Sequence, residues 1–387
     1  MSNSRIYLDN AATSWPKPNS VYDAVDHYQR SCGVPYGRGG YKAAAEVGRT
    51  IDQLRVQIAS LVKAKHASNV LFTYSGTDSL NLGIHGIVRA GDHVVTSLAE
   101  HNSVLRPLRY LEATHNVEVT RVAVNECGIV NPGDVIDAIR PNTRLVVAIH
   151  ASNVTGAIYD LAPIGQFCQR SSQPPFFLVD AAQSIGHIPV DVAQLGCDML
   201  AAPGHKGLLG PTGTGVLYVS DRAYEELQPY RQGGTGTQSE TDEQPTEPPA
   251  RFESGNHNVP GLVGLAAGIE YIQQTGLSSI RKHEIHLMTH LRERLQAIPH
   301  VSCFGPASAS ACVGVLSFNV ANIAPQDIAS ILDSTLTVQC RAGLHCAAMI
   351  HKAMGTFAIG GTVRLSVGPY STVEQLDAVA DLLEQLG

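Results

Sequence analysis

The feature that most constrains the fold is the alternation of short β-rich runs with helical patterns between about residues 70 and 220. The apolar, β-rich runs lie at residues 69–73, 93–96, 144–150, 176–179 and 215–219. Such alternation is typical of a mainly parallel sheet covered by helices. Open sheets of this kind bind ligands at the C-terminal ends of their strands. We therefore expect an α/β fold with its site at that edge.

A second, smaller body is expected towards the C-terminus. The acidic, Gly- and Pro-containing stretch 233–249 is typical of a long exposed loop between two bodies. Helical patterns and one strand run follow it, at residues 261–274, 277–297, 314–320 and 372–385. We therefore predict a large α/β domain at 15–255 and a smaller α+β domain formed by 1–14 and 256–387.

The composition argues against several classes of function. Of the 387 residues, 44% are hydrophobic and 16% charged, which favours a globular protein over a disordered or membrane protein. The net charge of −7 argues against nucleic acid or an anionic membrane as partner. The N-terminus lacks the apolar core of a signal peptide, and the eight cysteines are scattered without a CxxC pair. We therefore expect a cytoplasmic protein with reduced thiols and a small-molecule site.

Two residues of the predicted sheet edge suggest a specific chemistry. Lys206 follows an apolar segment within a run of small residues, and burial there would favour its neutral, nucleophilic amine. Asp180 directly follows a buried strand, where a carboxylate either caps a helix or faces a cation such as a pyridinium nitrogen. They are 26 positions apart, which leaves room for a helix and one more strand, so both can return to one sheet edge. Together they favour a pyridoxal site.

Eight motifs extend this hypothesis over nearly the whole chain. They are YLDNAAT (7–13), YSGTDSLN (74–81), EHNS (100–103), SNVTG (152–156), VDAAQ (179–183), GHK (204–206), RFESG (251–255) and RAGLHC (341–346). On these motifs the sequence resembles the class V aminotransferase-like enzymes that depend on pyridoxal 5′-phosphate (PLP), within them the cysteine desulfurases and selenocysteine lyases. The resemblance implies the type I PLP-dependent transferase fold.

The resemblance also implies roles around the cofactor ring. Lys206 would hold PLP as a Schiff base, and Asp180 would pair with the ring nitrogen. Gln183 would hydrogen-bond the ring hydroxyl. His101 would stack on the ring face and move protons, and Asn153 would lie near the ring oxygen or the substrate carboxylate.

A phosphate site is implied at the start of a helix. Gly76 and Thr77 would offer backbone N–H groups, and His205 would add a side-chain donor. Asp78 is unusual beside a phosphate, and we expect it to point away, capping the helix or facing the ring.

This chain departs from the family pattern at two positions of the phosphate site. Pro203 stands where relatives usually have a Ser, which removes one hydrogen bond. Asn256 stands where relatives have a Thr that reaches across a homodimer interface, and its amide would donate instead.

The RAGLHC loop favours desulfuration over other PLP reactions. It resembles the catalytic-Cys loop of desulfurases, in which Cys346 would receive sulfur from L-cysteine or L-selenocysteine as a persulfide. Arg341 and His345 would lower the pKa of its thiol, and Arg341 would also bind substrate. Arg364 would clamp the substrate α-carboxylate. An iron–sulfur scaffold, a sulfur-carrier protein or a thiol is implied as the acceptor.

Other functions remain open at this point. A selenocysteine lyase or a cysteine/cystine C–S β-lyase would differ only in details of the Cys loop. A class V aminotransferase or an epimerase would not need Cys346, and a non-catalytic dimer would not need Lys206. His283, His286 and His290 share one helical face, but without a further ligand motif we expect a solvated helix side and no metal site.

Overall fold

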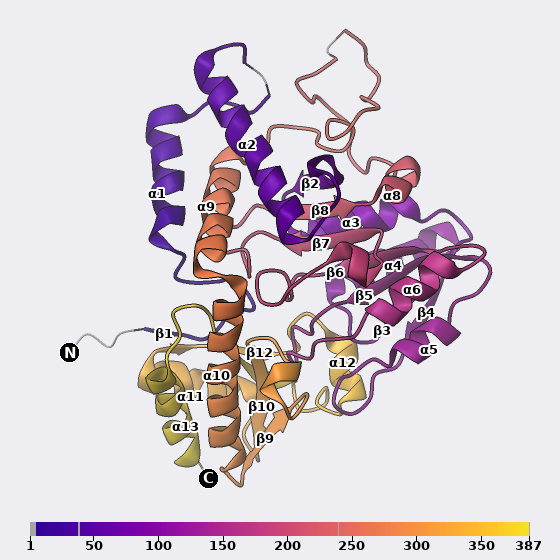
Figure 1. Cartoon of the computed structure of the whole chain (residues 1–387). Helices are drawn as coiled ribbons and strands as arrows, with labels where there is room; N and C mark the ends of the chain where they lie inside the picture. The colour runs from indigo at the N-terminus through magenta and orange to yellow at the C-terminus, as the bar shows by residue number, and fades with distance from the viewer. Residues whose placement is uncertain (1–4, 38, 239, 387) are drawn as a thin grey trace.

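The computed structural model describes residues 5–37, 39–238 and 240–386, and its centre is a seven-stranded sheet (Figure 1). Its strands, in spatial order, are β2 (Val70–Thr73), β8 (Gly215–Val219), β7 (Met199–Pro203), β6 (Phe176–Asp180), β5 (Thr143–Ile149), β3 (His93–Ser97) and β4 (Glu118–Val122). β8 runs antiparallel to both of its neighbours, β2 and β7, whereas the other pairings in this sheet are parallel. The mainly parallel α/β sheet expected from the sequence is confirmed.

Helices cover both faces of this sheet. One face packs against residues of α2 (Lys42–Leu61), α6 (Ala162–Arg170), α7 (Val192–Leu195) and α9 (Val259–Thr275). The other face packs against α3 (Gly76–Ile87), α4 (Asn102–His115) and α8 (Asp221–Glu226). In β6, Phe177 and Val179 point into the first core, whereas Phe176 and Leu178 point into the second. A strand buried on both faces needs a continuous apolar run, which is why these strands are visible in the sequence.

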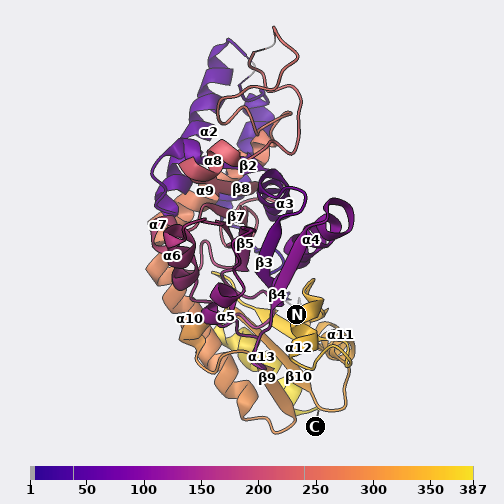
Figure 2. The ribbon, with the colours of Figure 1, turned by 90° about the vertical axis from the view of Figure 1, so that its right-hand side faces the viewer.

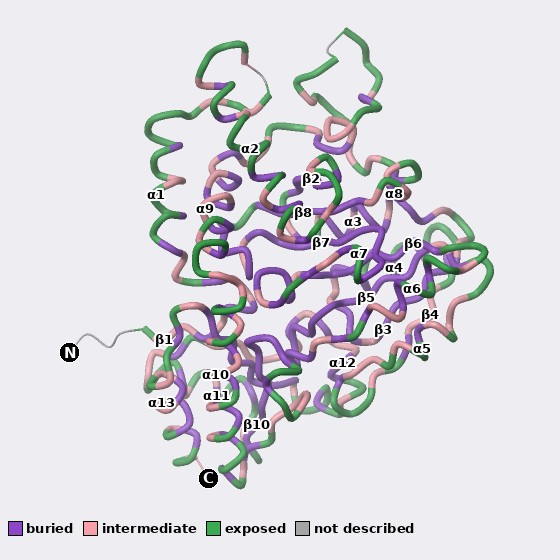
Figure 3. The backbone as a smooth tube through the Cα atoms, viewed as in Figure 1, coloured by how far each residue is buried: buried purple, intermediate pink, exposed green. Residues whose placement is uncertain are grey.

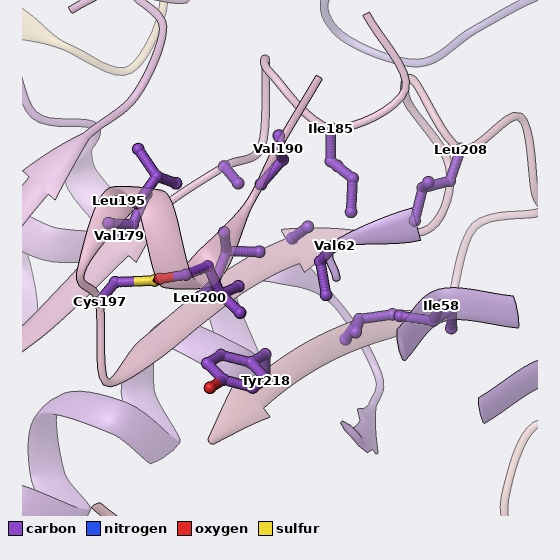
Figure 4. Close-up of a cluster of buried hydrophobic side chains, with 14 of the residues drawn as sticks. Ile58, Val62, Val179, Ile185, Val190, Leu195, Cys197, Leu200, Leu208 and Tyr218 are labelled. Carbon is purple, nitrogen blue, oxygen red and sulfur yellow. The ribbon is translucent and has the colours of Figure 1, made fainter. Parts of the chain in front are cut away.

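Figure 4 shows part of the first core. Side chains of Val179 and Leu200 from the sheet lie with Ile58 of α2 and with Cys197, which belongs to the same buried cluster. Cys197 is fully buried, and burial raises the pKa of its thiol well above the usual range. This cysteine is therefore a small apolar side chain of the core.

A second body lies below the first in Figures 1 and 2 and is built on an antiparallel sheet. Its strands, in spatial order, are β12 (Arg341–Gly343), β13 (Thr362–Ser366), β10 (Val315–Val320) and β9 (Val301–Phe304). Its core includes residues of α10 (Leu277–Gln296), α11 (Pro325–Leu336) and α13 (Val373–Glu384). The N-terminal segment joins this body, because β1 (Ile6–Tyr7) pairs in parallel with β11 (Val338–Gln339).

The chain passes from the first body to the second later than the expected boundary at 255/256. Helix α9 packs against α1 (Asn19–His27) and α2, within the core of the large sheet. Along α10, Ile280 still belongs to that core, whereas Leu287 belongs to the core of the second body. The domain bounds stay a prediction, and this packing favours a boundary within α10.

The remaining segments agree with the sequence pattern. The described part of 233–249 has no helix or strand and is mostly exposed (Figure 3). The short helices α5 (Pro132–Asp137) and α12 (Ala348–Ala353) complete the set of α-helices. No helix among the described residues is long and apolar enough to cross a membrane. The helix face of α10 that we expected to be solvated is partly covered, because His290 hydrogen-bonds Asp377 of α13.

Candidate active site

One cavity lies where β5, β6 and β7 end and where α3 and α4 begin. The sequence-predicted residues that line it are Gly76, Thr77, His101, Asn153, Asp180, Gln183, His205 and Lys206. They meet because β6 and β7 are parallel neighbours, with Asp180 opposite Ala201, so the segments that follow both strands leave the sheet at one edge. The single helix and strand between Asp180 and Lys206 are α7 and β7, as the spacing predicts.

The Lys206 amine is poised to react as a nucleophile. Burial lowers its pKa to about 8, the charge of Asp180 opposes that shift, and Arg364 and Arg341 add to it. An amine with this pKa has a substantial neutral fraction near neutral pH, unlike an ordinary surface lysine.

Asp180 is a buried carboxylate that faces the same cavity. Its Oδ1 accepts a hydrogen bond of 2.9 Å from the Ala182 N–H. Burial raises its pKa, while that hydrogen bond and the charge of Lys206 lower it. A carboxylate placed here is stabilised by a cation, which a protonated pyridine ring supplies. Gln183 is anchored beside it, because its Nε2 donates to the Ala11 carbonyl at 2.9 Å.

His101 caps the N-terminus of α4 and has a defined tautomer. Its Nδ1 accepts from the Ser103 backbone N–H at 3.1 Å. Burial, with the charges of Lys206 and Arg341, lowers its pKa to about 4. The ring is therefore neutral near pH 7, and because Nδ1 is an acceptor, its proton lies on Nε2.

The start of α3 provides an anion site. Ser75 caps this helix, its side chain accepting from the Asp78 N–H at 3.1 Å, and the first N–H groups of a helix have no intrahelical partner. Gly76 packs closely against β7, since a Cβ there would lie 3.0 Å from Pro203 Cδ. His205 completes the wall, and its buried Nδ1 has no hydrogen-bond partner within the described residues.

Two residues predicted to contact the cofactor are not among the lining residues of this cavity. Asp78 points away, as expected, because its Oδ2 accepts from the Tyr74 N–H at 2.9 Å and pairs with Arg231 at 3.1 Å. Asn256 is exposed, and its carbonyl accepts from the Tyr74 hydroxyl at 2.8 Å. Cofactor contacts of Asp78 and Asn256 stay predictions.

Arg364 reaches the site from the second body. The residue lies on β13 and is only 1% exposed. Its Nη1 donates to the Asn153 carbonyl at 3.0 Å, and its Nη2 donates to Asp9 at 2.7 Å. Its Nε is buried without a partner within the described residues, as is Oδ1 of Asn153. These unpaired atoms mark a place where a polar ligand is expected.

Cys346 lies in a fixed turn between β12 and α12. Arg341 Nη2 donates to its Sγ at 3.1 Å. Both His345 and Cys346 have positive φ, at 50° and 59°. The turn is held by two hydrogen bonds, from the Asn102 N–H to the Cys346 carbonyl at 2.8 Å and from Asn153 Nδ2 to the His345 carbonyl at 2.7 Å.

His345 does not contribute as expected from the sequence. Its Nε2 lies 3.1 Å from both the carbonyl and the hydroxyl oxygen of Thr362. Burial, with the charge of Arg364, lowers its pKa to about 2. The neutral ring supplies no positive charge to the neighbouring thiol, and Arg341 is the member of this pair that contacts Cys346 Sγ.

Sequence reasoning gave no role to Glu100 or Asp9. Glu100 is fully buried beside His101, its Oε1 accepting from Ser97 Oγ at 2.7 Å and the Ile149 N–H at 3.1 Å. Asp9 holds Arg364. Glu100 lies in the motif EHNS and Asp9 in the motif YLDNAAT. Their place in these motifs is the one sequence feature that could have indicated a role for them. Among the described residues, no group of three His, Cys, Asp or Glu side chains is arranged to hold a metal ion.

Comparisons with known proteins agree with this geometry. The aminotransferase class-V family model matches residues 6–379. A probable cysteine desulfurase of Methanothermobacter thermautotrophicus is 37% identical over 98% of this chain and 94% of its own length. A cysteine desulfurase of Escherichia coli strain SE11 is 31% identical over 98% of this chain and 93% of its own length.

Solved structures give the same result. The apo structure of a cysteine desulfurase from Thermococcus onnurineus has a TM-score of 0.91 at 34% identity and covers 99% of this chain and 95% of that one. An Escherichia coli cysteine desulfurase in its S-sulfonic acid form has a TM-score of 0.86 at 27% identity, covering 100% of this chain and 95% of that one. The chain belongs to the class V aminotransferase family and has the type I fold of its PLP-dependent enzymes.

Proposed function

We propose that this chain is a PLP-dependent cysteine desulfurase that converts L-cysteine to L-alanine and takes up the sulfur on Cys346 as a persulfide. One observation carries the proposal: the Arg341 guanidinium lies 3.1 Å from Cys346 Sγ, in a turn whose carbonyls are held by Asn102 and Asn153. The names of the relatives in both comparisons support it.

The residues of the cavity fit PLP. Lys206 would bind it covalently, Asp180 would pair with the ring nitrogen, and His101 would lie against the ring. The N-terminus of α3 and the unpaired Nδ1 of His205 would hold the phosphate. When bound, PLP supplies an electron sink for the bonds at the substrate Cα.

Substrate binding and proton transfer fall to residues that the structure has brought together. Arg364 would hold the α-carboxylate through its Nε, which lacks a partner within the described residues. Asn153 would lie beside it and support the guanidinium, because its backbone carbonyl accepts from Arg364 Nη1. The neutral amine of Lys206 would accept the proton from Cα. His101 would hold a second proton at Nε2, since its Nδ1 is bonded to Ser103.

The sulfur step uses Cys346. Its sulfur, which lies against the Arg341 guanidinium, attacks the sulfur of the substrate. The substrate Cβ–S bond breaks, a new S–S bond forms on Cys346, and the carbon skeleton gains a proton and leaves as alanine. The sulfur is transferred without any external oxidant or reductant.

Other activities on this scaffold are less well supported. An aminotransferase, an epimerase or a β-lyase that releases sulfide directly has no use for a cysteine held against an arginine. A selenocysteine lyase remains the second candidate, because the same residues would bind L-selenocysteine, and competition between the two substrates would distinguish them.

Three further features belong to the proposal. A homodimer would bring Asn256 of each subunit to the phosphate site of the other. The persulfide would pass to a protein or thiol acceptor, and iron–sulfur assembly is one such use. A cytoplasmic location is consistent with the eight cysteines, all of them free in the structure.

The decisive experiment measures alanine and sulfide from L-cysteine with a reductant present, in wild type and in Cys346→Ala. We expect the variant to keep the visible absorbance of bound PLP and to lose at least about 99% of its alanine formation, since the nucleophile is gone. The matched control is Cys340→Ala, because burial raises the pKa of that nearby thiol to about 12 and keeps it protonated.

The control should retain activity. Undiminished alanine formation by Cys346→Ala would overturn the desulfurase assignment and favour a lyase. Formation of pyruvate in place of alanine would favour the lyase activity. Formation of glutamate in a parallel assay with added 2-oxoglutarate would favour the aminotransferase activity.

A further inference from the structure

A second pocket adjoins the cavity and ends at Cys346. It shares Thr77, His101 and Ser103 with the cavity and extends along α3 and α4 to His85 and Tyr110. Its volume is about 480 Å³, which is within the range of small-molecule sites. We call it the outer pocket. The substrate site does not account for it, because Lys206, Asp180 and His205 line only the inner cavity.

The fixed turn of Cys346 decides how an acceptor can reach it. The residues between β12 and α12 form a short turn held by Asn102 and Asn153. Cys346 is only partly exposed and opens into the outer pocket. A persulfide there is not carried to the surface by a long loop, so the acceptor has to enter the pocket.

The charge of the outer pocket indicates what kind of acceptor would enter. Arg106 is exposed on α4, lines the pocket, and forms no ion pair within the described residues. None of the residues that line the pocket in the described structure is Asp or Glu. Tyr110, which is 56% exposed, and His85 supply an aromatic wall near Arg106. A lone guanidinium in a pocket without carboxylates favours a carboxylate ligand.

We propose that the outer pocket binds a small thiol carrying a carboxylate, which Arg106 holds while the thiol removes sulfur from Cys346. The inference rests on the proposed desulfurase function. The acceptor thiolate attacks the outer sulfur of the Cys346 persulfide, the S–S bond to Cys346 breaks, and its electron pair returns to Sγ beside Arg341. The acceptor leaves as a persulfide, with no change in the total number of electrons.

The test measures clearance of sulfur from the PLP-loaded enzyme after one turnover with sulfur-labelled L-cysteine. Three probes of similar size are compared, 3-mercaptopropionate, 2-mercaptoethanol and cysteamine, each rate being corrected for the ionised fraction of the thiol. We expect saturable transfer to the anionic thiol, with a half-saturating concentration about fivefold lower than for the neutral thiol.

The Arg106→Gln variant should lose this preference while the neutral thiol serves as internal reference. Arg109→Gln is the matched control, because Arg109 lies on the same helix but pairs with Glu112 at 3.6 Å, and it should keep the preference. Equal half-saturating concentrations for all three thiols, or an unchanged preference in Arg106→Gln, would overturn the inference. It would also be overturned if none of the three thiols clears the sulfur and only a protein acceptor does.

The two proposals fail in different ways in this experiment. If wild-type enzyme forms no labelled Cys346 persulfide and no alanine, the desulfurase function fails. If the persulfide forms and is cleared without a preference for the anionic thiol, only the outer-pocket inference fails.

Discussion

At the residue scale, Glu100 shows how the site uses burial to control charge. Its carboxyl lies beside His101, and its Oε2 has no partner within the described residues. Burial raises its pKa to about 8, against the hydrogen bonds from Ser97 and Ile149, and the nearby charge of Asp180 adds to the shift. A neutral Glu100 adds no second negative charge beside Asp180, the carboxylate that faces the cavity.

This shift predicts a pH dependence of stability. Because the folded-state pKa is raised, the proton on Glu100 stabilises the fold at low pH, and that contribution is lost as the pH rises from about 4.5 to about 8. Glu100→Gln, which is neutral throughout, should be more stable than wild type near the upper limit by about 1–3 kcal/mol. This difference in stability between Glu100→Gln and wild type should shrink as the pH falls towards about 4.5, and thermal unfolding measures it.

Glu118→Gln is the matched control, because Glu118 is an exposed carboxylate paired with Arg140. It should change the melting temperature little across the same range. A Glu100→Gln variant that is less stable than wild type at every pH would show that Glu100 is ionised in the folded protein.

At the element scale, the outcome shows what a sequence pattern can and cannot reveal. The strands buried on both faces were predicted within about one residue of their observed bounds, because their apolar runs are continuous. Strand β7 was seen only as an apolar segment, since its second half, Ala201–Pro203, is made of small residues. Strand β4 was missed because it lies at the sheet edge and reads EVTRV, with little apolar character.

The site shows the same limit. Residues that follow strands of one sheet, such as Asp180 and Lys206, could be placed together from order and spacing. Side-chain direction near a turn of positive φ decides that Arg341 contacts Cys346 and that His345 contacts Thr362 instead. Neither spacing nor composition specifies this direction. The contact between Asp9 and Arg364 joins residues from opposite ends of the chain, so only the folded structure reveals it.

The close packing of α3 against Pro203 predicts that a side chain at Gly76 disturbs the site. A Cβ at Gly76 would lie 3.0 Å from Pro203 Cδ and 3.1 Å from its nitrogen, so Gly76→Ala must shift the start of α3 or the end of β7. Both flank the anion site. We expect PLP affinity to fall by about tenfold or more, with a loss of stability of about 1–3 kcal/mol. Equilibrium titration of the apoprotein with PLP measures the first effect.

Gly48→Ala provides the matched control. Gly48 lies within α2, and a Cβ there would meet nothing within 4 Å. Alanine is favoured over glycine in a helix by about 1 kcal/mol, so this variant should be more stable and keep its affinity for PLP. If both variants bind PLP as tightly as wild type, the start of α3 is not the phosphate site.

At the scale of the whole molecule, the site exists only where the two bodies meet. The first body supplies Lys206, Asp180 and His101, whereas the second supplies Arg364 and the turn of Cys346. Asn153 joins them, because its carbonyl accepts from Arg364 and its side chain donates to the His345 carbonyl. The first body therefore has to hold α9 firmly, since this helix leads to α10 and so to the second body.

A buried ion pair fastens the loop before α9 to the large sheet. Arg55 of α2 and Glu253 form two hydrogen bonds, of 2.7 and 2.6 Å, and their side chains are only 6% and 3% exposed. Glu253 also accepts from the Phe72 N–H at 2.7 Å. Burial alone would raise the pKa of Glu253, but Arg55 and His257 lower it to about 2, so the carboxylate stays ionised.

Glu253→Gln should therefore destabilise the protein by about 3–5 kcal/mol, because it leaves the Arg55 charge buried without a counter-charge. The double variant Arg55→Met with Glu253→Met should lose less stability than Glu253→Gln, since no buried charge remains. Denaturant unfolding measures both. If the double variant loses as much stability as Arg55→Met and Glu253→Met lose together, the two residues act independently. The ion pair would then not be what fastens α2 and β2 to the loop before α9.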